Sequence, residues 1–248
     1  MDLSLVDMER LPKHIGLILD GNGRWANQRG LHRTEGHQAG EQAMFDTVEG
    51  AVELGIEWLS AFTFSTENWT RDEEEVGFLM FFNRDVLVRR RDALDEMGVR
   101  VRFAGDLDDP RVPQENRDYM SETAEMTAGN KKMNLVFAFN YGSRREIARA
   151  CRLIASKVSA GELDPEAIDE STVAAHMWVP EMPDLDLVIR SSGEHRLSNF
   201  FMWQAAYAEF AFPGILWPDF NRQLLVDAVV DYQNRDRRFG GAVDAPST

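Results

Sequence analysis

Short apolar segments alternate with longer segments of helical periodicity along most of the chain. Consecutive apolar residues predict buried strands, whereas apolar residues at every third or fourth position predict helices. The predicted strands are 14–19, 56–64, 99–104, 133–139, 185–189 and 206–212. The predicted helices are 36–54, 72–97, 114–127, 143–159, 171–177 and 221–237. This alternation predicts an α/β fold whose six-stranded, mostly parallel sheet is flanked by helices and covered on both faces.

The alternation continues without a repeat, a low-complexity linker or a change of composition, which predicts a single domain. We assign residues 13–241 to this domain, residues 1–12 to an N-terminal extension and residues 242–248 to a disordered tail. No segment has the apolar length of a signal peptide or a membrane span. Because Cys151 is the single cysteine, an internal disulfide is excluded. We expect Cys151 to lie on a helix with its side chain in the hydrophobic core. We therefore expect a cytoplasmic protein.

The chain is strongly acidic, with 27 lysines and arginines against 42 acidic residues and a net charge of −15. An acidic surface argues against nucleic-acid binding, and an anionic small ligand would need arginines gathered locally. In parallel α/β sheets, ligands bind beyond the carboxyl ends of the strands. Arginines and small polar residues do follow four predicted strands, in segments 20–24, 64–71, 140–144 and 190–198. These segments predict an anion-binding site at one edge of the sheet.

The first of these segments, Asp20-Gly-Asn-Gly-Arg24, is a glycine-rich loop between a predicted strand and a helical segment. Glycines allow backbone N–H groups to close on an anion, and the Arg24 guanidinium matches phosphate oxygens. A carboxylate directly before such a loop is unfavourable for an anion unless a cation joins them. Asp20 therefore suggests Mg²⁺, which favours one or two carboxylates together with phosphate oxygens.

Two other interpretations of this loop are weaker. Residues 21–26 match the G-x-G-x-x-A pattern of dinucleotide binding, but that motif requires an acidic residue about twenty positions later, after the second strand. Here the second predicted strand ends more than forty residues after the glycines. A purely structural turn would explain the glycines, but it would not explain Asp20 and Arg24 together.

Five separate segments resemble signature stretches of the cis-prenyltransferases. They are Phe64-Ser-Thr-Glu-Asn-Trp69 followed by Arg71, residues 186–200, Trp203-Gln-Ala-Ala-Tyr-Ala-Glu209, Leu216-Trp-Pro-Asp-Phe220, and Arg237-Arg-Phe-Gly240. Together with the Asp20 loop they extend from about Lys13 to Gly241 in the family's order. The sequence is most similar to bacterial undecaprenyl and decaprenyl diphosphate synthases.

The resemblance implies a Mg²⁺-dependent transferase with a hydrophobic tunnel for the growing chain, acting as a homodimer. Such an enzyme condenses isopentenyl diphosphate with an allylic diphosphate in cis. Overall similarity favours a medium or long product, such as a decaprenyl or undecaprenyl lipid-carrier precursor, and leaves farnesyl and geranyl diphosphate open as starters. Release of that product implies transient peripheral contact with the inner face of the membrane, without an anchor.

The resemblance also assigns roles to individual residues. Asp20 is expected to bind Mg²⁺ and promote departure of the allylic diphosphate, and Asn68 to assist proton removal. The allylic diphosphate is expected to contact Gly21, Asn22, Gly23, Arg24, Trp25, Arg33 and His37. The segment between the two substrates is expected to contribute Ser65, Thr66, Glu67, Trp69 and Arg71. Isopentenyl diphosphate is expected to contact Arg190, Arg196, Leu197 and Ser198. Glu209 is expected as a second metal ligand, with His195 a candidate third, and Arg238 and Gly240 to reach the partner subunit's site.

Several residues, most of them apolar, are candidates for the tunnel wall, and the apolar ones fit a packed core equally well. They are Thr63, the run 78–82, Met133, Phe137 and Phe139, and a larger side chain at Thr63 would be expected to shorten the product. A catalytically silent relative would be expected to lack Asp20, the arginines or the terminal Arg-x-Gly, all of which are present here. The all-helical trans-prenyl synthases are excluded because Asp108-Asp109 continues as Pro-Arg-Val rather than as Asp-Asp-x-x-Asp.

Overall fold

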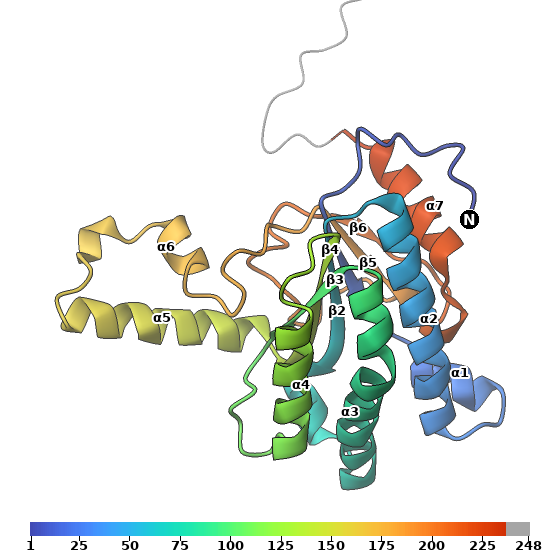
Figure 1. Cartoon of the computed structure of the whole chain (residues 1–248), viewed down its shortest axis with the longest axis horizontal. Coiled ribbons are helices and arrows are strands. Elements are labelled where there is room, and N and C mark those ends of the chain that lie inside the picture. Colours follow the sequence, from blue (N-terminus) through green and yellow to red (C-terminus); the bar gives the residue numbers. More distant parts are fainter. Residues whose placement is uncertain (237–248) are drawn as a thin grey trace, which may run out of the picture.

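Six parallel strands form a single sheet at the centre of the molecule (Figure 1). The computed structural model describes residues 1–236. The strands are β1 His14–Ile18, β2 Trp58–Ser65, β3 Val99–Ala104, β4 Met133–Tyr141, β5 Leu187–Arg190 and β6 Glu209–Ala211. Their order is β3-β4-β2-β1-β5-β6, and every pairing is parallel. The predicted sheet is therefore confirmed, and within the described residues it is entirely parallel.

Helices occupy most of the connections between the strands. The α-helices are α1 Asn22–Gln28, α2 Arg33–Leu54, α3 Glu73–Glu96, α4 Gln114–Met126, α5 Ser143–Ser159, α6 Glu170–Ala174 and α7 Arg222–Gln233. The short 3-10 helices are η1 Thr66–Thr70, η2 Pro165–Ala167, η3 Ser191–Gly193 and η4 Trp217–Asp219. Among the residues described, no helix combines the length and the apolar character that crossing a bilayer requires.

The hydrophobic core lies on both faces of the sheet, because successive strand residues point to opposite sides. Phe137 of β4 belongs to a cluster with residues of α2, α3, α4 and α7. The neighbouring residues Val136 and Ala138 belong to a second cluster, whose other members come largely from the chain between α6 and β6. One face is thus covered by helices and the other mainly by an extended connection.

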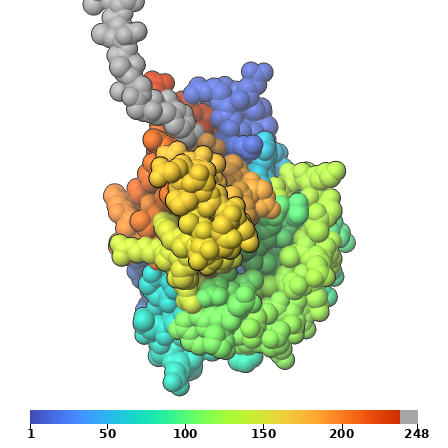
Figure 2. Space-filling model, turned by 90° about the vertical axis from the view of Figure 1, so that its left-hand side faces the viewer, coloured from blue at the N-terminus to red at the C-terminus, as the bar shows by residue number. Residues whose placement is uncertain are grey.

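Helix α5 projects from the body of the molecule, and α6 lies beside it (Figure 1). Figure 2 looks along this projection, with the α6 region in front of the body. Cys151 lies on α5 and is exposed, so its predicted place in the core is wrong. The helix is amphipathic, and Cys151 falls on its exposed face, whereas Ala150 and Ile154 are buried.

Predicted boundaries differ from the structure where local contacts extend or shorten an element. Helix α2 begins at Arg33 rather than at residue 36, because His32 caps it and Glu35 accepts a hydrogen bond from the His32 backbone at 2.9 Å. Strand β4 continues to Tyr141, which pairs with Ser65 beyond an irregularity in β2. Strand β6 is shorter than predicted, and α7 ends at Gln233.

Candidate active site

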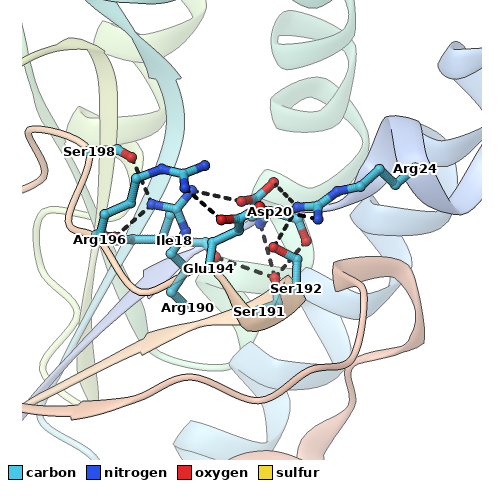
Figure 3. Close-up of polar contacts among 9 residues, drawn as sticks. All are labelled: Ile18, Asp20, Arg24, Arg190, Ser191, Ser192, Glu194, Arg196 and Ser198. Carbon is cyan, nitrogen blue, oxygen red and sulfur yellow. Dashed lines mark hydrogen bonds and ion pairs between the residues drawn. The ribbon is translucent and has the colours of Figure 1, made fainter.

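The carboxyl ends of β1 and β5 bring Asp20 and Arg190 together. The two strands are neighbours in the sheet, with Ile18 of β1 in register with Arg190, the last residue of β5. Asp20 follows two residues after β1. The Arg190 Nη2 group donates to Asp20 Oδ2 at 2.7 Å (Figure 3). Residues that are 170 positions apart in the sequence therefore form the centre of the site.

Arg190 is buried, with 4% of its surface exposed. Its Nη1 group donates to the Arg196 carbonyl at 2.6 Å and to Ser198 Oγ at 2.7 Å. Its Nε group is also buried and has no partner among the described residues. A buried N–H without a partner is costly, so this donor is suited to an anionic ligand entering the site.

Arg24 approaches Asp20 from the opposite side (Figure 3). Its Nη2 group donates to Asp20 Oδ1 at 3.1 Å and to Ser192 Oγ at 2.6 Å. Burial raises the pKa of Asp20, but hydrogen bonds from Arg190 and from Ser192 lower the pKa by more, so it lies below its usual range. Asp20 is therefore ionised at neutral pH and is held between two guanidinium groups.

The loop after β5 contributes residues that the sequence analysis did not assign. Ser191 Oγ donates to the Asp20 carbonyl at 2.7 Å and accepts from the Asp20 backbone N–H at 3.0 Å. Glu194 accepts from Arg196 at 2.6 Å and lies 3.5 Å from Arg24, so it links the two arginines. Ser192 and Asn199 have left-handed backbone φ angles of 77° and 67°. Such strained conformations concentrate at functional sites. The sequence signals for this loop were the small residues after a buried strand and the resemblance of residues 186–200 to the family.

The connection between β2 and α3 faces a cavity that Asp20 and Arg190 also line. Ser65, Glu67, Asn68 and Arg71 all line it. Asn68 Oδ1 accepts a hydrogen bond from the Ser65 backbone N–H at 2.9 Å, so the carboxamide oxygen is engaged with its own segment. Arg71 donates to Glu75 at 2.7 Å, and Arg33 lies 3.3 Å from the same Glu75 carboxylate. Glu75 was not predicted, and it links Arg33 to Arg71, which lines the cavity.

His37 lines the cavity beside the aromatic rings of Phe78 and Phe82, at centroid distances of 5.9 and 6.3 Å. Burial, reinforced by the nearby charge of Arg71, lowers its pKa to about 4. His37 is therefore neutral at physiological pH and can donate or accept a hydrogen bond without adding positive charge.

The glycines of the first loop permit close packing. Gly21 has a left-handed φ of 107°, and a Cβ there would lie 2.8 Å from Leu216 Cδ2. A Cβ on Gly23 would lie 3.1 Å from Arg33 Nε, so Arg33 is adjacent to the loop. Asn22 lines the cavity.

Four predicted site residues have side chains engaged elsewhere. The Trp25 indole donates to Asp219 at 2.7 Å, and the Trp69 indole donates to Asn140 at 2.7 Å. His195 is exposed and stacks on Phe212. Glu209 pairs with Arg235 at 3.0 Å.

The remaining predictions fall beside the site or outside the structure. Glu209 is in register with Leu187 at the amino end of β5, whereas Asp20 lies beyond the carboxyl end of β1, so the two carboxylates do not meet within one chain. Thr66 packs against Gly142, and Leu197 against the second core cluster. Arg238 and Gly240 lie outside the described residues. The metal role of Glu209 and the roles of Arg238 and Gly240 stay predictions.

A cavity of about 610 Å³ extends from this polar mouth into the helical side of the core. Its deeper lining is apolar and consists of Met44, Phe45, Leu79, Phe82, Val86, Leu87, Phe103, Met120, Phe137 and Phe139. Thr63 also lines it, whereas Met133 does not and Phe81 is 56% exposed. A volume of this size is typical of small-molecule sites. A single cavity therefore has charged side chains at its mouth and apolar side chains along its interior.

The donor set fits Mg²⁺ held jointly by the protein and a ligand. Within residues 1–236, no group of three or more His, Cys, Asp or Glu side chains is placed to hold a metal alone. Asp20 supplies a carboxylate whose side chain is 26% exposed at the cavity mouth. Mg²⁺ favours such a carboxylate together with phosphate oxygens and water, and the unpaired Arg190 Nε donor suits the same phosphate.

Comparison with known proteins identifies the family. Residues 18–240 match the prenyltransferase family described as "Putative undecaprenyl diphosphate synthase". The chain is 53% identical over 238 residues to a trans,polycis-polyprenyl diphosphate synthase ((2Z,6E)-farnesyl diphosphate specific) of Thermobifida fusca, covering 96% of this chain and 84% of that protein. It is also 53% identical over 233 residues to the decaprenyl diphosphate synthase of Mycobacterium leprae, covering 94% of this chain and 78% of that protein.

The fold is similarly shared. The crystal structure of lavandulyl diphosphate synthase from Lavandula x intermedia, in complex with dimethylallyl diphosphate, superposes with a TM-score of 0.90 at 37% identity, covering 94% of this chain and 99% of that one. The family match, the identities and the shared fold agree with the site geometry. The chain therefore belongs to the cis-prenyltransferase family.

Proposed function

We propose that this protein condenses isopentenyl diphosphate with an allylic diphosphate in cis, forming a medium or long polyprenyl diphosphate such as a decaprenyl or undecaprenyl lipid-carrier precursor. The observation that carries the proposal is the continuity of the cavity. Asp20 and Arg190 line its polar mouth, with Arg24 bonded to Asp20 there, and apolar side chains line its interior. An amphipathic substrate with a diphosphate head and a growing hydrocarbon tail matches both ends.

The arginines solve an electrostatic problem. Two diphosphates must lie close together, and their mutual repulsion opposes this. Arg24 and Arg190 both form ion pairs with Asp20, and Arg71 lines the same mouth. Guanidinium forks bind phosphate oxygens in bidentate fashion, so these residues would hold the two head groups and offset the repulsion.

The same donors would stabilise the reaction itself. Ionisation of the allylic C–O bond builds negative charge on the leaving diphosphate, and fixed donors directed at that charge lower the barrier. Asp20 would hold Mg²⁺, which supplies further charge neutralisation at the diphosphate when it is bound. The isopentenyl double bond then attacks the cationic carbon, and loss of a proton completes the step. Asn68 lies at the mouth, where it would assist the removal of that proton, as the resemblance to the family implies.

The names of the relatives suggest several candidates for the allylic diphosphate that starts the chain. One relative is named as specific for (2Z,6E)-farnesyl diphosphate, and the structural relative was solved with dimethylallyl diphosphate. The apolar lining of the cavity is compatible with chains of different length. We propose farnesyl or geranyl diphosphate as the starter for this protein.

We further propose a cytoplasmic homodimer that contacts the membrane only transiently for product release. The terminal Arg238 and Gly240 would then complete the partner subunit's site, and Glu209 would act as a second metal ligand. These proposals rest on the resemblance of the terminal and Glu209 motifs to those of the family.

The deciding experiment is incubation of the protein with Mg²⁺, labelled isopentenyl diphosphate and farnesyl, geranyl or dimethylallyl diphosphate in turn, with products sized by chromatography. We expect a ladder that ends at one polyprenyl length and disappears when Mg²⁺ is chelated or in Asp20→Ala. Asp227→Ala is a matched control, because Asp227 lies on α7 and bonds to Gln223. Absence of incorporation with every starter would instead favour a catalytically silent subunit.

A further inference from the structure

We propose that Trp69 and Asn140 form a positioning pair that holds η1 in place, so that Asn68 and Arg71 face the cavity while the Trp69 indole itself contacts no substrate. This inference rests on the proposed function and assigns a role to Asn140, which lies at the end of β4. Trp69 Nε1 donates to Asn140 Oδ1 at 2.7 Å. Of the residues around Trp69, Asn68 and Arg71 line the cavity, and Trp69 does not.

The Trp69 indole is enclosed by two neighbours. The Phe64 ring meets it edge-on at a centroid distance of 5.0 Å, and the Arg111 guanidinium lies 4.5 Å from its centroid. Arg111 is itself fixed by Asp109, which accepts from its Nε at 3.0 Å and from its Nη2 at 2.7 Å. The Trp69 ring is packed on both neighbours and its N–H group is hydrogen-bonded, so the side chain holds η1 in a fixed position.

Asn140, which accepts the Trp69 hydrogen bond, is itself held in a fixed orientation. Its side chain is fully buried and its backbone has a left-handed φ of 46°, a conformation that asparagine tolerates better than most residues. Its Nδ2 group donates to the Asp106 carbonyl at 2.7 Å, and its own carbonyl accepts from the Asp106 backbone N–H at 3.2 Å. The carboxamide therefore joins η1 to the loop after β3, and both of its ends are used.

Two further contacts hold η1 on the same side. A Cβ on Gly142 would lie 2.6 Å from Thr66 Oγ1, so the backbone after β4 packs directly against η1. Asn199 Nδ2 donates to Glu67 Oε1 at 2.9 Å. The Trp69–Asn140 bond is partly buried and ends on the fully buried Asn140, whereas Glu67 is exposed. Loss of the Trp69–Asn140 bond is therefore expected to release η1 more than loss of either other contact.

The test compares Trp69→Phe, Asn140→Gly and the double variant. Phenylalanine keeps an aromatic ring but removes the N–H donor, and glycine removes the carboxamide without strain at the positive φ. Trp178→Phe is the matched control, because Trp178 packs on Tyr141 and Arg149 away from the cavity. Amide hydrogen exchange over residues 65–71, which needs no activity, is measured together with kcat and the KM for isopentenyl diphosphate.

We expect both single variants to accelerate exchange over residues 65–71 and to lower kcat/KM for isopentenyl diphosphate about tenfold, because Asn68 and Arg71 are no longer held at the mouth. The losses in the double variant should be smaller than the sum of the two single losses, because both substitutions remove the Trp69–Asn140 bond, while Asn140→Gly also removes the bond to the Asp106 carbonyl. Trp178→Phe should leave exchange and kcat/KM unchanged.

Three other outcomes would contradict the proposal that Trp69 and Asn140 position η1. Unchanged exchange in either single variant, or fully additive losses in the double variant, would show that the bond does not hold η1. A loss of kcat/KM in Trp69→Phe alone would indicate that the indole contacts substrate directly. If the unmodified protein forms no product with any starter, the proposed function fails, and hydrogen exchange alone then decides whether the pair positions η1.

Discussion

Arg190 is the side chain on which the polar contacts of the cavity mouth converge. It binds Asp20, the Arg196 carbonyl and Ser198, while its Nε group has no partner within residues 1–236. A planar guanidinium can make these contacts at once because its donors point in fixed directions. A lysine ammonium carries the same charge but cannot reproduce that geometry.

We therefore predict that Arg190→Lys raises the KM for isopentenyl diphosphate by about 10- to 100-fold, since a hydrogen bond to a charged group contributes about 1.5–3 kcal/mol. Steady-state kinetics with a fixed allylic diphosphate measure this. Arg152→Lys is the matched control, because Arg152 is exposed on α5. Equal KM values for the two variants would contradict the assignment of Arg190 to substrate binding.

His14 is a second residue whose environment has a measurable consequence. It is fully buried in β1, its Nδ1 lies 2.8 Å from the Pro183 carbonyl, and its Nε2 lies 2.7 Å from Ser60 Oγ. A carbonyl accepts only, so Nδ1 carries the proton and Nε2 accepts from the serine, which is the neutral form. Burial lowers the pKa of His14 from 6.5 to about 4.

The stability of the fold is accordingly predicted to fall in mild acid. The unfolded chain takes up a proton on His14 below pH 6.5, while the folded protein resists protonation until about pH 4. Stability from this group is thus complete above pH 6.5 and declines as the pH falls, by about 2 kcal/mol at pH 5. Urea unfolding at pH 7 and pH 5 should show a smaller decline in His14→Asn, and an identical decline would exclude His14 as the cause.

At the scale of elements, the contact between α1 and α2 sets the position of the first loop. A Cβ on Gly36 of α2 would lie 2.1 Å from the Asn22 carbonyl oxygen, and one on Gly40 would lie 2.4 Å from Asn22 Oδ1. Backbone of α2 therefore approaches α1 more closely than any side chain would allow. This contact keeps Asn22 and its neighbour Arg24 beside Asp20.

Gly36→Ala is predicted to displace α1, because the clash is with a backbone atom that cannot rotate away. We expect a loss of about 1–3 kcal/mol in unfolding free energy and a higher KM for the allylic diphosphate. Gly77→Ala on α3 is the control, since a Cβ at Gly77 would meet no atom within 4 Å and alanine favours helix by about 0.5–1 kcal/mol. An unaltered KM in Gly36→Ala would mean that α1 does not position the diphosphate.

The cavity is a property of the whole molecule, because its wall is shared by the sheet and by α2, α3 and α4. Thr63 enters this wall at an irregularity of β2, where the register with β4 shifts between Phe62 and Phe64. Bulges of this kind redirect a side chain without breaking the sheet. Thr63 Oγ1 donates to the Ala138 carbonyl at 3.1 Å, which fixes its orientation.

A larger side chain at Thr63 is predicted to shorten the product. In Thr63→Leu the added volume would occupy the cavity, so chain growth should stop after fewer isopentenyl additions while the first addition continues. Chromatographic sizing of labelled products measures this. Thr63→Val keeps the original shape and should retain the original product length, whereas unchanged products in Thr63→Leu would place the growing chain elsewhere.

The type of most elements and their succession along the chain followed from the sequence alone, because hydrophobic periodicity is a local property, but helix α1 was not among the predicted helices. β3 and α5 occur at their predicted boundaries. The boundaries of α2 and β4 differ from the predicted ones, because His32 caps α2 and because β4 pairs with β2 beyond a register shift. The segments that supply Asp20, Arg71 and Arg190 were also identifiable, since polar residues after buried strands of a parallel sheet gather at one edge.

Only the tertiary structure decided which of those residues meet and where each side chain points. The adjacency of β1 and β5 joins Asp20 to Arg190, whereas the register of β6 with β5 places Glu209 at the other end of the sheet. The left-handed backbone of Asn140 directs its carboxamide toward the Trp69 indole. Strand order and side-chain direction arise from contacts between residues far apart in the chain, and the local periodicity of a sequence carries no information about them.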